Sequence, residues 1–486
     1  MKTAFVLAGV LSAVVLSGAV ELPAIFSDHA VLARKEKVPV FGTAAPGEKI
    51  VVACNGRKAE TVAGKDGAWR VDLNLKDAPE TPFELRVNEK VVKDVAAGEV
   101  WLCSGQSNMA FAMRGDVNFQ KKVKKTPGAV IRRFYVSAPG SAEPRKNCKG
   151  RWVYADARSL QFFSAVGYYF AEELLKNNIG PVGLIQSVQG ASRIESWMSE
   201  ESLKELIPDA KAQTAAKKAT VKPYRLPLMM FNARINPLVP YRLTGVIWYQ
   251  GESNTRDPQN YAALFRTMIR DWRKRFEDPD LPFFWCNLPF FRDRSADPAE
   301  QSRWAELRAA QTAVLDLPHT GQAVLADTGE TAEIHPRDKH MAGARLGALA
   351  LNRVYGRKIP DCGPSAEKVV REGGKLRIAF KDAHGGLKAM PVPEEYDIST
   401  RKGKKGKTVR NSPGTQLEGF ALCGADGVWH WAEEAVVDGD TVVISSGKVP
   451  LPTGVKYAWQ DSPVCNLYNG AGFPAVPFQR KCDGIK

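Results

Sequence analysis

Four short polar segments of this sequence carry side chains that can do chemistry. They span residues 104–109, 187–199, 248–254 and 333–339. The first is Ser-Gly-Gln-Ser-Asn-Met and contains Ser107. A serine on a tight turn between a strand and a helix exposes its hydroxyl and can aim its own N–H at a developing oxyanion. Ser107 is therefore a candidate nucleophile, although its surroundings are not the Gly-x-Ser-x-Gly elbow, and it could instead cap the helix that follows.

The second segment, Ser-Val-Gln-Gly-Ala-Ser-Arg-Ile-Glu-Ser-Trp-Met-Ser, offers a backbone donor and two substrate-binding candidates. Gly190 follows an apolar run and, having no side chain, permits close approach to its N–H. Arg193 and Trp197 could hold a polar sugar by charge and by stacking. Alternatively, Arg193 pairs with Glu195 and Trp197 fills the interior of the loop. Gln106, beside Ser107, is a third substrate-binding candidate.

The third and fourth segments supply an amide, carboxylates and an imidazole. In Trp-Tyr-Gln-Gly-Glu-Ser-Asn, Asn254 can donate from its side chain and Glu252 can accept from an imidazole, unless the segment is only a surface turn. In Glu-Ile-His-Pro-Arg-Asp-Lys, His335 is one of six histidines in the chain and stands ahead of a predicted helix. At the end of a sheet, it could reach Ser107 as a general base.

These segments follow apolar runs that read as strands of a doubly wound sheet. The runs are residues 100–103, 182–185, 245–248, 282–285 and 323–326, and continuous apolar runs of this length are typical of parallel strands covered on both faces. Residues 163–175, 261–276 and 342–351 have apolar residues at helical spacing. Because ligands bind where loops leave the carboxyl ends of such strands, the polar segments are expected to meet at one edge.

Two β-rich portions flank this α/β unit. Alternating residues at 38–42, 50–53, 68–72 and 83–87, separated by turn formers, predict a small antiparallel unit over 20–99. Residues 375–380, 441–445 and 455–459 predict strands in a second portion over 359–486, after a catalytic unit at 100–358. The two β portions are either separate units or one domain interrupted by the catalytic unit.

Composition indicates an exported globular protein. The 486 residues include 44% hydrophobic and 25% charged residues. Residues 1–19 have the short apolar stretch and small-residue end of a signal peptide, which predicts a secreted or periplasmic protein without a membrane span once the peptide is removed. A net charge of +15 favours acidic partners. The basic residues are dispersed and accompany no nucleic-acid motif, so a nucleic-acid partner is not expected.

The eight cysteines form no Cys-x-x-Cys pair, and no His/Cys/Asp group has metal-ligand spacing. We therefore expect neither a metal nor another cofactor. Cys103 and Cys286 stand in apolar runs and are predicted to be buried free thiols. Bridges among the other six are permitted by export but cannot be assigned.

Taken together, the four segments resemble the sequence blocks of the SGNH hydrolases, and most closely those of the sialate O-acetylesterase branch. Further similar stretches lie at residues 26–32, 457–461, 466–469 and 473–478, so the resemblance covers nearly the whole mature chain. It implies an SGNH, flavodoxin-like parallel-sheet hydrolase domain flanked by jelly-roll or sandwich-like β portions.

The resemblance also implies roles. Ser107 would be the nucleophile and His335 the base, with the N–H groups of Ser107 and Gly190 and the side chain of Asn254 forming the oxyanion hole. Many SGNH hydrolases have an aspartate three residues before the histidine, where this chain has Ala332. Glu252 is the first choice for the acid and Glu333 the alternative, although Glu333 is expected to point away from His335. A Ser-His pair whose imidazole is held by a backbone carbonyl is a further alternative.

The resemblance predicts hydrolysis of acetyl esters on sugars, above all on O-acetylated sialic acids, through an acyl-enzyme. The nearest rival is the same chemistry on acetylated xylan or another glycan. A protein that binds glycans without catalysis is the alternative of a different class. The oligomeric state is not predicted.

Overall fold

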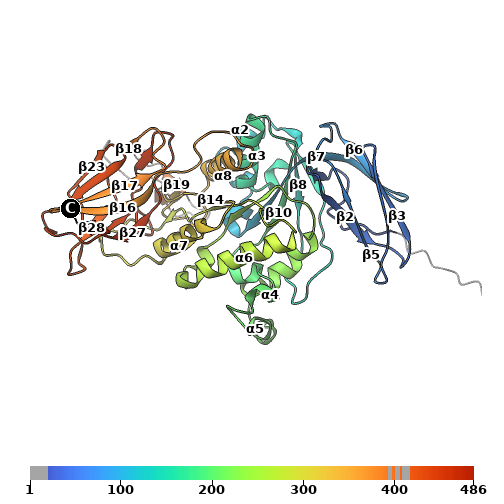
Figure 1. The fold of residues 1–486 in the computed structure, drawn as a ribbon, viewed down its shortest axis with the longest axis horizontal. Helices are drawn as coiled ribbons and strands as arrows, with labels where there is room; N and C mark the ends of the chain where they lie inside the picture. The colour runs from blue at the N-terminus through green and yellow to red at the C-terminus, as the bar shows by residue number, and fades with distance from the viewer. Residues whose placement is uncertain (1–19, 392–396, 400–404, 408–415, 486) are drawn as a thin grey trace, which may run out of the picture.

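We describe a computed structural model of the chain, which covers residues 20–391, 397–399, 405–407 and 416–485. The predicted signal peptide at residues 1–19 lies outside the described residues. The molecule is elongated, with an α/β unit in the middle and a β-rich unit at each end (Figure 1).

The central unit is built on a largely parallel sheet. Its strands run in the spatial order β14-β12-β11-β7-β10-β8-β9, and every neighbouring pair is parallel except β8 and β9. The strand bounds are β7 Lys90–Gly105, β8 Gly128–Tyr135, β9 Trp152–Ala155, β10 Val182–Val188, β11 Gly245–Tyr249, β12 Phe283–Cys286 and β14 Thr320–Ala323. All predicted strands of this unit are present, but the last begins and ends three residues earlier than predicted.

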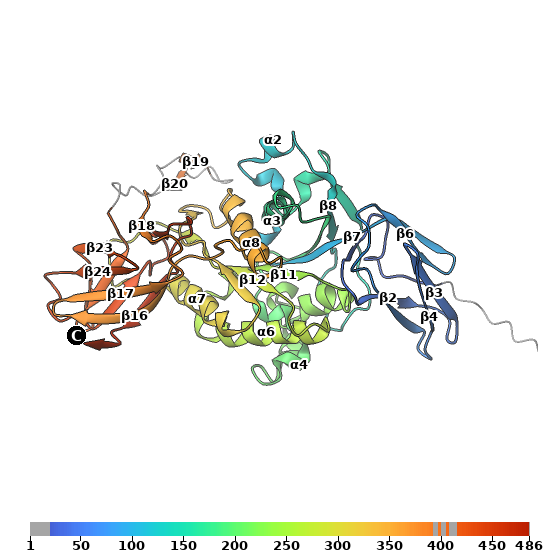
Figure 2. The ribbon, with the colours of Figure 1, turned by 45° about the horizontal axis from the view of Figure 1, so that its top comes forward.

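Helices cover both faces of the sheet, which confirms the doubly wound arrangement. On one face lie α3 (Ala165–Lys176) and α8 (His340–Arg353), and on the other α6 (Tyr261–Arg275) and α7 (Arg303–Thr312) (Figures 1 and 2). Leu102 of β7 packs into one core and its neighbours Trp101 and Cys103 into the other. This double burial explains why the strands are apolar without alternation. The remaining α-helices are short: α1 Ser107–Ala110, α2 Phe119–Lys122, α4 Glu200–Leu203 and α5 Ala210–Lys217.

The N-terminal β unit shares a strand with the central sheet. β7 begins as the partner of β6 and β1 and continues as the middle strand of the α/β unit. The predicted boundary at residues 99 and 100 therefore falls inside one continuous strand. The other strands of this unit are β1 Val31–Ala33, β2 Val38–Thr43, β3 Lys49–Cys54, β4 Arg57–Val62, β5 Ala68–Leu73 and β6 Phe83–Val87.

The C-terminal unit is a sandwich of two antiparallel-rich sheets around one core. One sheet holds β16 Ser365–Glu372, β17 Lys375–Lys381, β23 Glu434–Asp438, β24 Thr441–Ser445 and β28 Gly484–Ile485. The other holds β21 Phe420–Cys423, β22 Trp429–Trp431, β25 Gly454–Tyr457 and β27 Phe478–Lys481. This unit lies at the opposite end of the molecule from the N-terminal unit (Figure 2). The alternative in which the two β portions form one domain is therefore wrong.

All eight cysteines are free thiols in the structure, and Cys103 and Cys286 are buried as predicted. Burial raises the pKa of both thiols above the usual range. Within the ranges given above, no helix is both long and apolar enough to cross a membrane.

Candidate active site

Ser107 lies directly after the central strand, at the first residue of α1. The turn depends on Gly105, whose φ is +129° and whose added Cβ would lie 2.2 Å from the carbonyl oxygen of Tyr249. Gln106, not Ser107, is the N-cap residue, so the prediction that Ser107 caps the helix is wrong. The Ser107 hydroxyl has no hydrogen-bond partner among the described residues and faces a cavity.

Gly190 lies beside Ser107 because β10 and β7 end in register. Val188 pairs with Gly105, and a Cβ added to Gly190 would lie 3.6 Å from Cβ of Ser107. Over the described part of the chain, neither the Ser107 N–H nor the Gly190 N–H has an acceptor. Two unoccupied backbone donors beside one serine hydroxyl are the arrangement that an oxyanion requires.

The cavity at Ser107 has a volume of about 430 Å³, and residues of the histidine segment also line it. Its lining brings together residues that are far apart in the sequence: Ser107, Arg114, Gly190, Glu330, Glu333, His335 and Arg337. A cavity of this size is within the usual range for a small ligand. The structure thus unites the predicted serine, the predicted glycine and the predicted histidine in one site.

Glu333 is the carboxylate in contact with His335. Its Oε1 lies 3.0 Å from Nδ1 of His335 and also accepts from the His335 backbone N–H at 3.2 Å. The expectation that Glu333 points away from His335 is therefore wrong, because the turn folds the side chain back over its own backbone. With Nδ1–H donated to this carboxylate, Nε2 is the basic nitrogen of the ring.

Glu252 is occupied by a different partner. Its Oε1 accepts a hydrogen bond from Nδ2 of Asn108, while its Oε2 is buried without a hydrogen-bond partner among the described residues. Burial raises the pKa of the Glu252 carboxyl, and the Asn108 hydrogen bond only partly offsets this rise. Glu252, the acid that the sequence favoured, therefore lies beneath the serine turn and accepts its hydrogen bond from Asn108.

Asn108 connects the serine turn with the histidine segment. Its Nδ2 also donates to the carbonyl oxygen of Ile334 at 3.1 Å, and its Oδ1 accepts from Nζ of Lys339 at 2.6 Å. Lys339 is 1% exposed, and burial lowers its pKa to about 8. A buried network thus forms from Asn108, Glu252 and Lys339. It joins the turn that carries Ser107 to the segment that carries His335. Sequence reasoning missed Asn108 and Lys339, because nothing in the pattern marks a lysine as buried.

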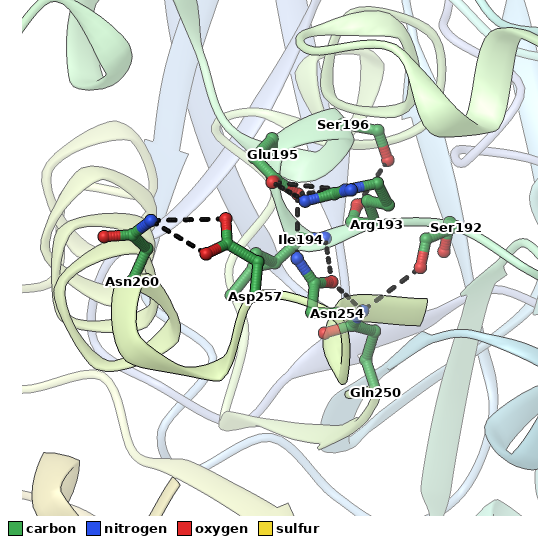
Figure 3. Close-up of polar contacts among 9 residues, drawn as sticks. All are labelled: Ser192, Arg193, Ile194, Glu195, Ser196, Gln250, Asn254, Asp257 and Asn260. Atoms are coloured by element: carbon green, nitrogen blue, oxygen red, sulfur yellow. Dashed lines mark hydrogen bonds and ion pairs between the residues drawn. The ribbon is translucent and has the colours of Figure 1, made fainter. Parts of the chain in front are cut away.

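Asn254 is not among the residues that line the cavity at Ser107. Its side-chain amide contacts the 192–197 loop and Gln250 (Figure 3). Its Oδ1 accepts from the backbone N–H of Ile194 at 3.0 Å and from Nε2 of Gln250 at 2.8 Å. Its Nδ2 donates to Oε2 of Glu195 at 3.0 Å. Both ends of the amide therefore hold the 192–197 loop in place. Nδ2 carries two hydrogens, of which one is donated to Glu195, so the oxyanion role of Asn254 stays a prediction.

The three predicted substrate-binding residues also have structural partners. Arg193 pairs with Glu195, with 2.7 Å between the nearest nitrogen and oxygen (Figure 3). Trp197 is fully buried and packs edge-on against Trp248, so it cannot stack on a bound sugar and that prediction is wrong. Gln106 is 3% exposed, and its Oε1 accepts from the N–H groups of Gly251 and Ser253. Gln106 thus joins two turns instead of lining the cavity.

One group with metal-ligating atoms occurs in the described residues, although none was expected from spacing. Cys362, Asp382 and His384 bring one ligand atom each within 4.8 Å of the others. The group belongs to the C-terminal unit and does not line the Ser107 cavity.

Comparison with known proteins shows which family this chain is similar to. Residues 97–349 match the family model described as carbohydrate esterase, sialic acid-specific acetylesterase. The chain is 28% identical to human sialate O-acetylesterase over 493 residues, which is 90% of this chain and 88% of the human protein. It is also 28% identical to the mouse sialate O-acetylesterase over 426 residues, covering 73% of this chain and 78% of the mouse protein.

Among solved structures, the chain is similar to a carbohydrate acetylesterase from Xanthomonas citri. The TM-score is 0.83 and the sequence identity 34%, over 95% of this chain and 99% of the other. The resemblance therefore extends through both β units as well as the central sheet. The chain belongs to the sialic acid-specific acetylesterase family of carbohydrate esterases, and it is a carboxylic ester hydrolase whose relatives act on acetylated sugars.

Proposed function

We propose that this protein is a secreted SGNH-type serine esterase that removes O-acetyl groups from sialic acids. Ser107 is the nucleophile, His335 the general base and Glu333 the acid that orients the imidazole. The observation that carries the proposal is the cavity shared by Ser107, Gly190 and His335, with Glu333 on Nδ1 of the histidine.

The reaction proceeds in two steps. His335 Nε2 removes the proton from the Ser107 hydroxyl as Oγ attacks the acetyl carbonyl carbon, and the same proton then passes to the departing sugar oxygen. The N–H groups of Ser107 and Gly190 stabilise the oxyanion, each by roughly 3 kcal/mol in the transition state. Water, deprotonated by His335, hydrolyses the acetyl-enzyme and releases acetate.

The charge of the cavity supports an acidic sugar. Arg114 and Arg337 both line it, and Arg114 is exposed. Arg337 lies 3.7 Å from Glu330, so Arg114 is the cation available to a substrate carboxylate. Sialic acids carry a carboxylate, whereas acetylated xylan has a neutral backbone. The names of the human and mouse relatives point the same way.

Acetate release from purified protein tests the proposal. The substrates are an aryl acetate, an O-acetylated sialic acid and acetylated xylan. Ser107→Ala should abolish release from all three, while Ser104→Ala, at a buried serine near the end of β7, should leave it intact. The wild type should prefer the sialic acid. Full activity of Ser107→Ala would overturn the nucleophile, and a preference for xylan would overturn the substrate.

A further inference from the structure

A second cavity opens at the same edge of the sheet as the candidate active site. It has a volume of about 720 Å³ and lies at the end of β8, where its lining includes Arg133, Tyr135, Arg151, Arg158 and Phe162. β8, β10 and β7 are parallel neighbours in that order. The end of β8 is therefore two strands away from the end of β7, a separation of roughly 10 Å.

The two cavities share a wall. Arg114 lines the Ser107 cavity, and its guanidinium lies 5.5 Å above the ring of Phe162, which lines the second cavity. The adjoining backbone is tied together, because Met113 donates its N–H to the carbonyl oxygen of Phe163 at 2.9 Å. A ligand longer than one sugar unit can thus extend from one cavity into the other across Arg114.

The second cavity carries unbalanced positive charge. Arg133, Arg151 and Arg158 line it, against the single carboxylate of Asp156. None of the three arginines has an ion-pair partner within 4.0 Å in the part of the chain that the structure describes. Arg133 is the most constrained: its Nε is buried without a hydrogen bond, and burial together with the charge of Arg151 lowers its pKa to about 10. An anionic ligand would balance the positive charge of these three arginines.

Two exposed aromatic rings complete the lining. Phe162 is 47% exposed and Tyr135 is 37% exposed, although both rings are of a size that proteins usually bury. Their flat apolar faces can pack against the C–H face of a sugar ring. Aromatic faces next to arginines therefore fit a sugar that carries a negative charge.

We propose that this second cavity is a subsite for an acidic sugar unit that neighbours the acetylated unit over Ser107. The substrate would then be an oligosaccharide with more than one acidic sugar. The inference rests on the proposed function for the identity of the acetylated unit, but binding in the subsite requires no catalysis.

Equilibrium binding tests the subsite separately from catalysis. Full-length Ser107→Ala protein is titrated calorimetrically with an unacetylated oligosialic acid and with a neutral xylo-oligosaccharide of equal length. The acidic chain should bind more tightly, and adding Arg151→Gln or Tyr135→Ala should weaken its binding roughly tenfold each. Arg270→Gln, at an exposed arginine of α6, should have no effect. Absence of binding, equal binding of both chains, or unchanged binding in the Arg151 and Tyr135 variants would overturn the subsite.

Kinetics then link the subsite to the esterase. For the otherwise wild-type enzyme, Arg151→Gln should raise KM for an O-acetylated oligosialic acid and leave kcat and the rates on the O-acetylated monosaccharide unchanged. An equal loss on both substrates would assign Arg151 to the catalytic cavity and overturn the subsite. If the wild type cleaves neither substrate while the acidic chain still binds through Arg151, the proposed function fails and the subsite stands.

Discussion

At the scale of single residues, His335 has a neighbouring carboxylate two positions before it instead of three. Oε1 of Glu333 contacts both the backbone N–H and the ring Nδ1 of His335. This double contact needs no aspartate at position 332, where the chain has alanine. Glu252, in contrast, supports Asn108 from beneath the serine turn. The two glutamates should therefore respond differently to removal of their charge.

Glu333→Gln is expected to lower kcat by roughly 100- to 10,000-fold, because the imidazolium loses its carboxylate partner and the ring its orientation. Glu252→Gln keeps an acceptor for Asn108 and should lower kcat by no more than about tenfold. Initial rates on an aryl acetate measure both effects. A larger loss in the Glu252 variant would assign the acid to Glu252 instead.

Lys339 should make the stability of the protein depend on pH. Burial lowers its pKa to about 8 from 10.5, so between these values the unfolded chain binds more protons than the folded one. The contribution of Lys339 to the free energy of unfolding should therefore rise with pH across this window, by up to about 3 kcal/mol. Urea titrations at pH 8 and pH 10.5 should show this gain for the wild type relative to Lys339→Met. As a control, methionine in place of the exposed Lys65 should leave this rise in the free energy of unfolding unchanged. If Lys339→Met showed the same rise as the wild type, Lys339 would not be its cause.

At the scale of the elements, the site is made by the register of β7, β10 and β11. Gly105 pairs with Val188 on one side and with Tyr249 on the other, so three strand ends meet at Ser107. Gly105 has a φ of +129°, which places the turn against the carbonyl oxygen of Tyr249. No other residue type has room at this position.

Gly105→Ala should accordingly reduce the free energy of unfolding by more than about 3 kcal/mol and abolish esterase activity, because its Cβ would collide with β11. Gly128→Ala is the matched control: Gly128 also has a positive φ, of +63°, but no atom lies within 4 Å of an added Cβ. We expect this control to lose about 1 kcal/mol and to retain activity. Chemical denaturation and an acetate assay measure the two effects, and equal losses would show that backbone strain alone decides the outcome.

At the scale of the whole molecule, the C-terminal unit contacts the α/β unit at Asp327, whose carboxylate is held by a buried ion pair within the α/β unit. Both terminal nitrogens of Arg345 on α8 lie 2.6 Å from the carboxylate of Asp327, which also accepts from the Tyr468 hydroxyl at 2.7 Å. Tyr468 lies on β26 (Leu467–Asn469) of the C-terminal unit. A second contact is made by Arg308 of α7, which donates to the carbonyl oxygens of Gln460 and Asp461.

Arg345→Met should cost roughly 3–5 kcal/mol of stability, because it leaves the buried Asp327 carboxylate without its cation. Tyr468→Phe removes only one hydrogen bond and should cost about 1 kcal/mol. Urea denaturation gives both values. If Arg345→Met were no more destabilising than Tyr468→Phe, the Asp327 carboxylate would not depend on Arg345 for its stability in the buried site.

The sequence by itself determined the elements and the candidate chemistry of their loops. Apolar runs and helical spacing are local properties, so β10, β11, β12, β14, α3, α6 and α8 were predicted within a few residues. β8, β9 and α7 were not predicted, and neither was the N-terminal part of β7. The positions of Ser107 and Gly190 at one edge of the sheet were predictable, because each closely follows an apolar run and such runs end together in a doubly wound sheet. The family resemblance rested on the same local blocks and agrees with the comparisons.

Only the tertiary structure decided how these side chains are used. Contacts between segments far apart in the chain decide which glutamate contacts His335 and which partners Asn254 has. The same kind of contact decides that Trp197 and Lys339 are buried and that a second cavity forms. The direction of a side chain and its exposure are set by those contacts, and a one-dimensional pattern does not contain them. The length of β7, which joins the N-terminal unit to the central sheet, was hidden for the same reason: its pairing partners change along the strand while its sequence shows no break.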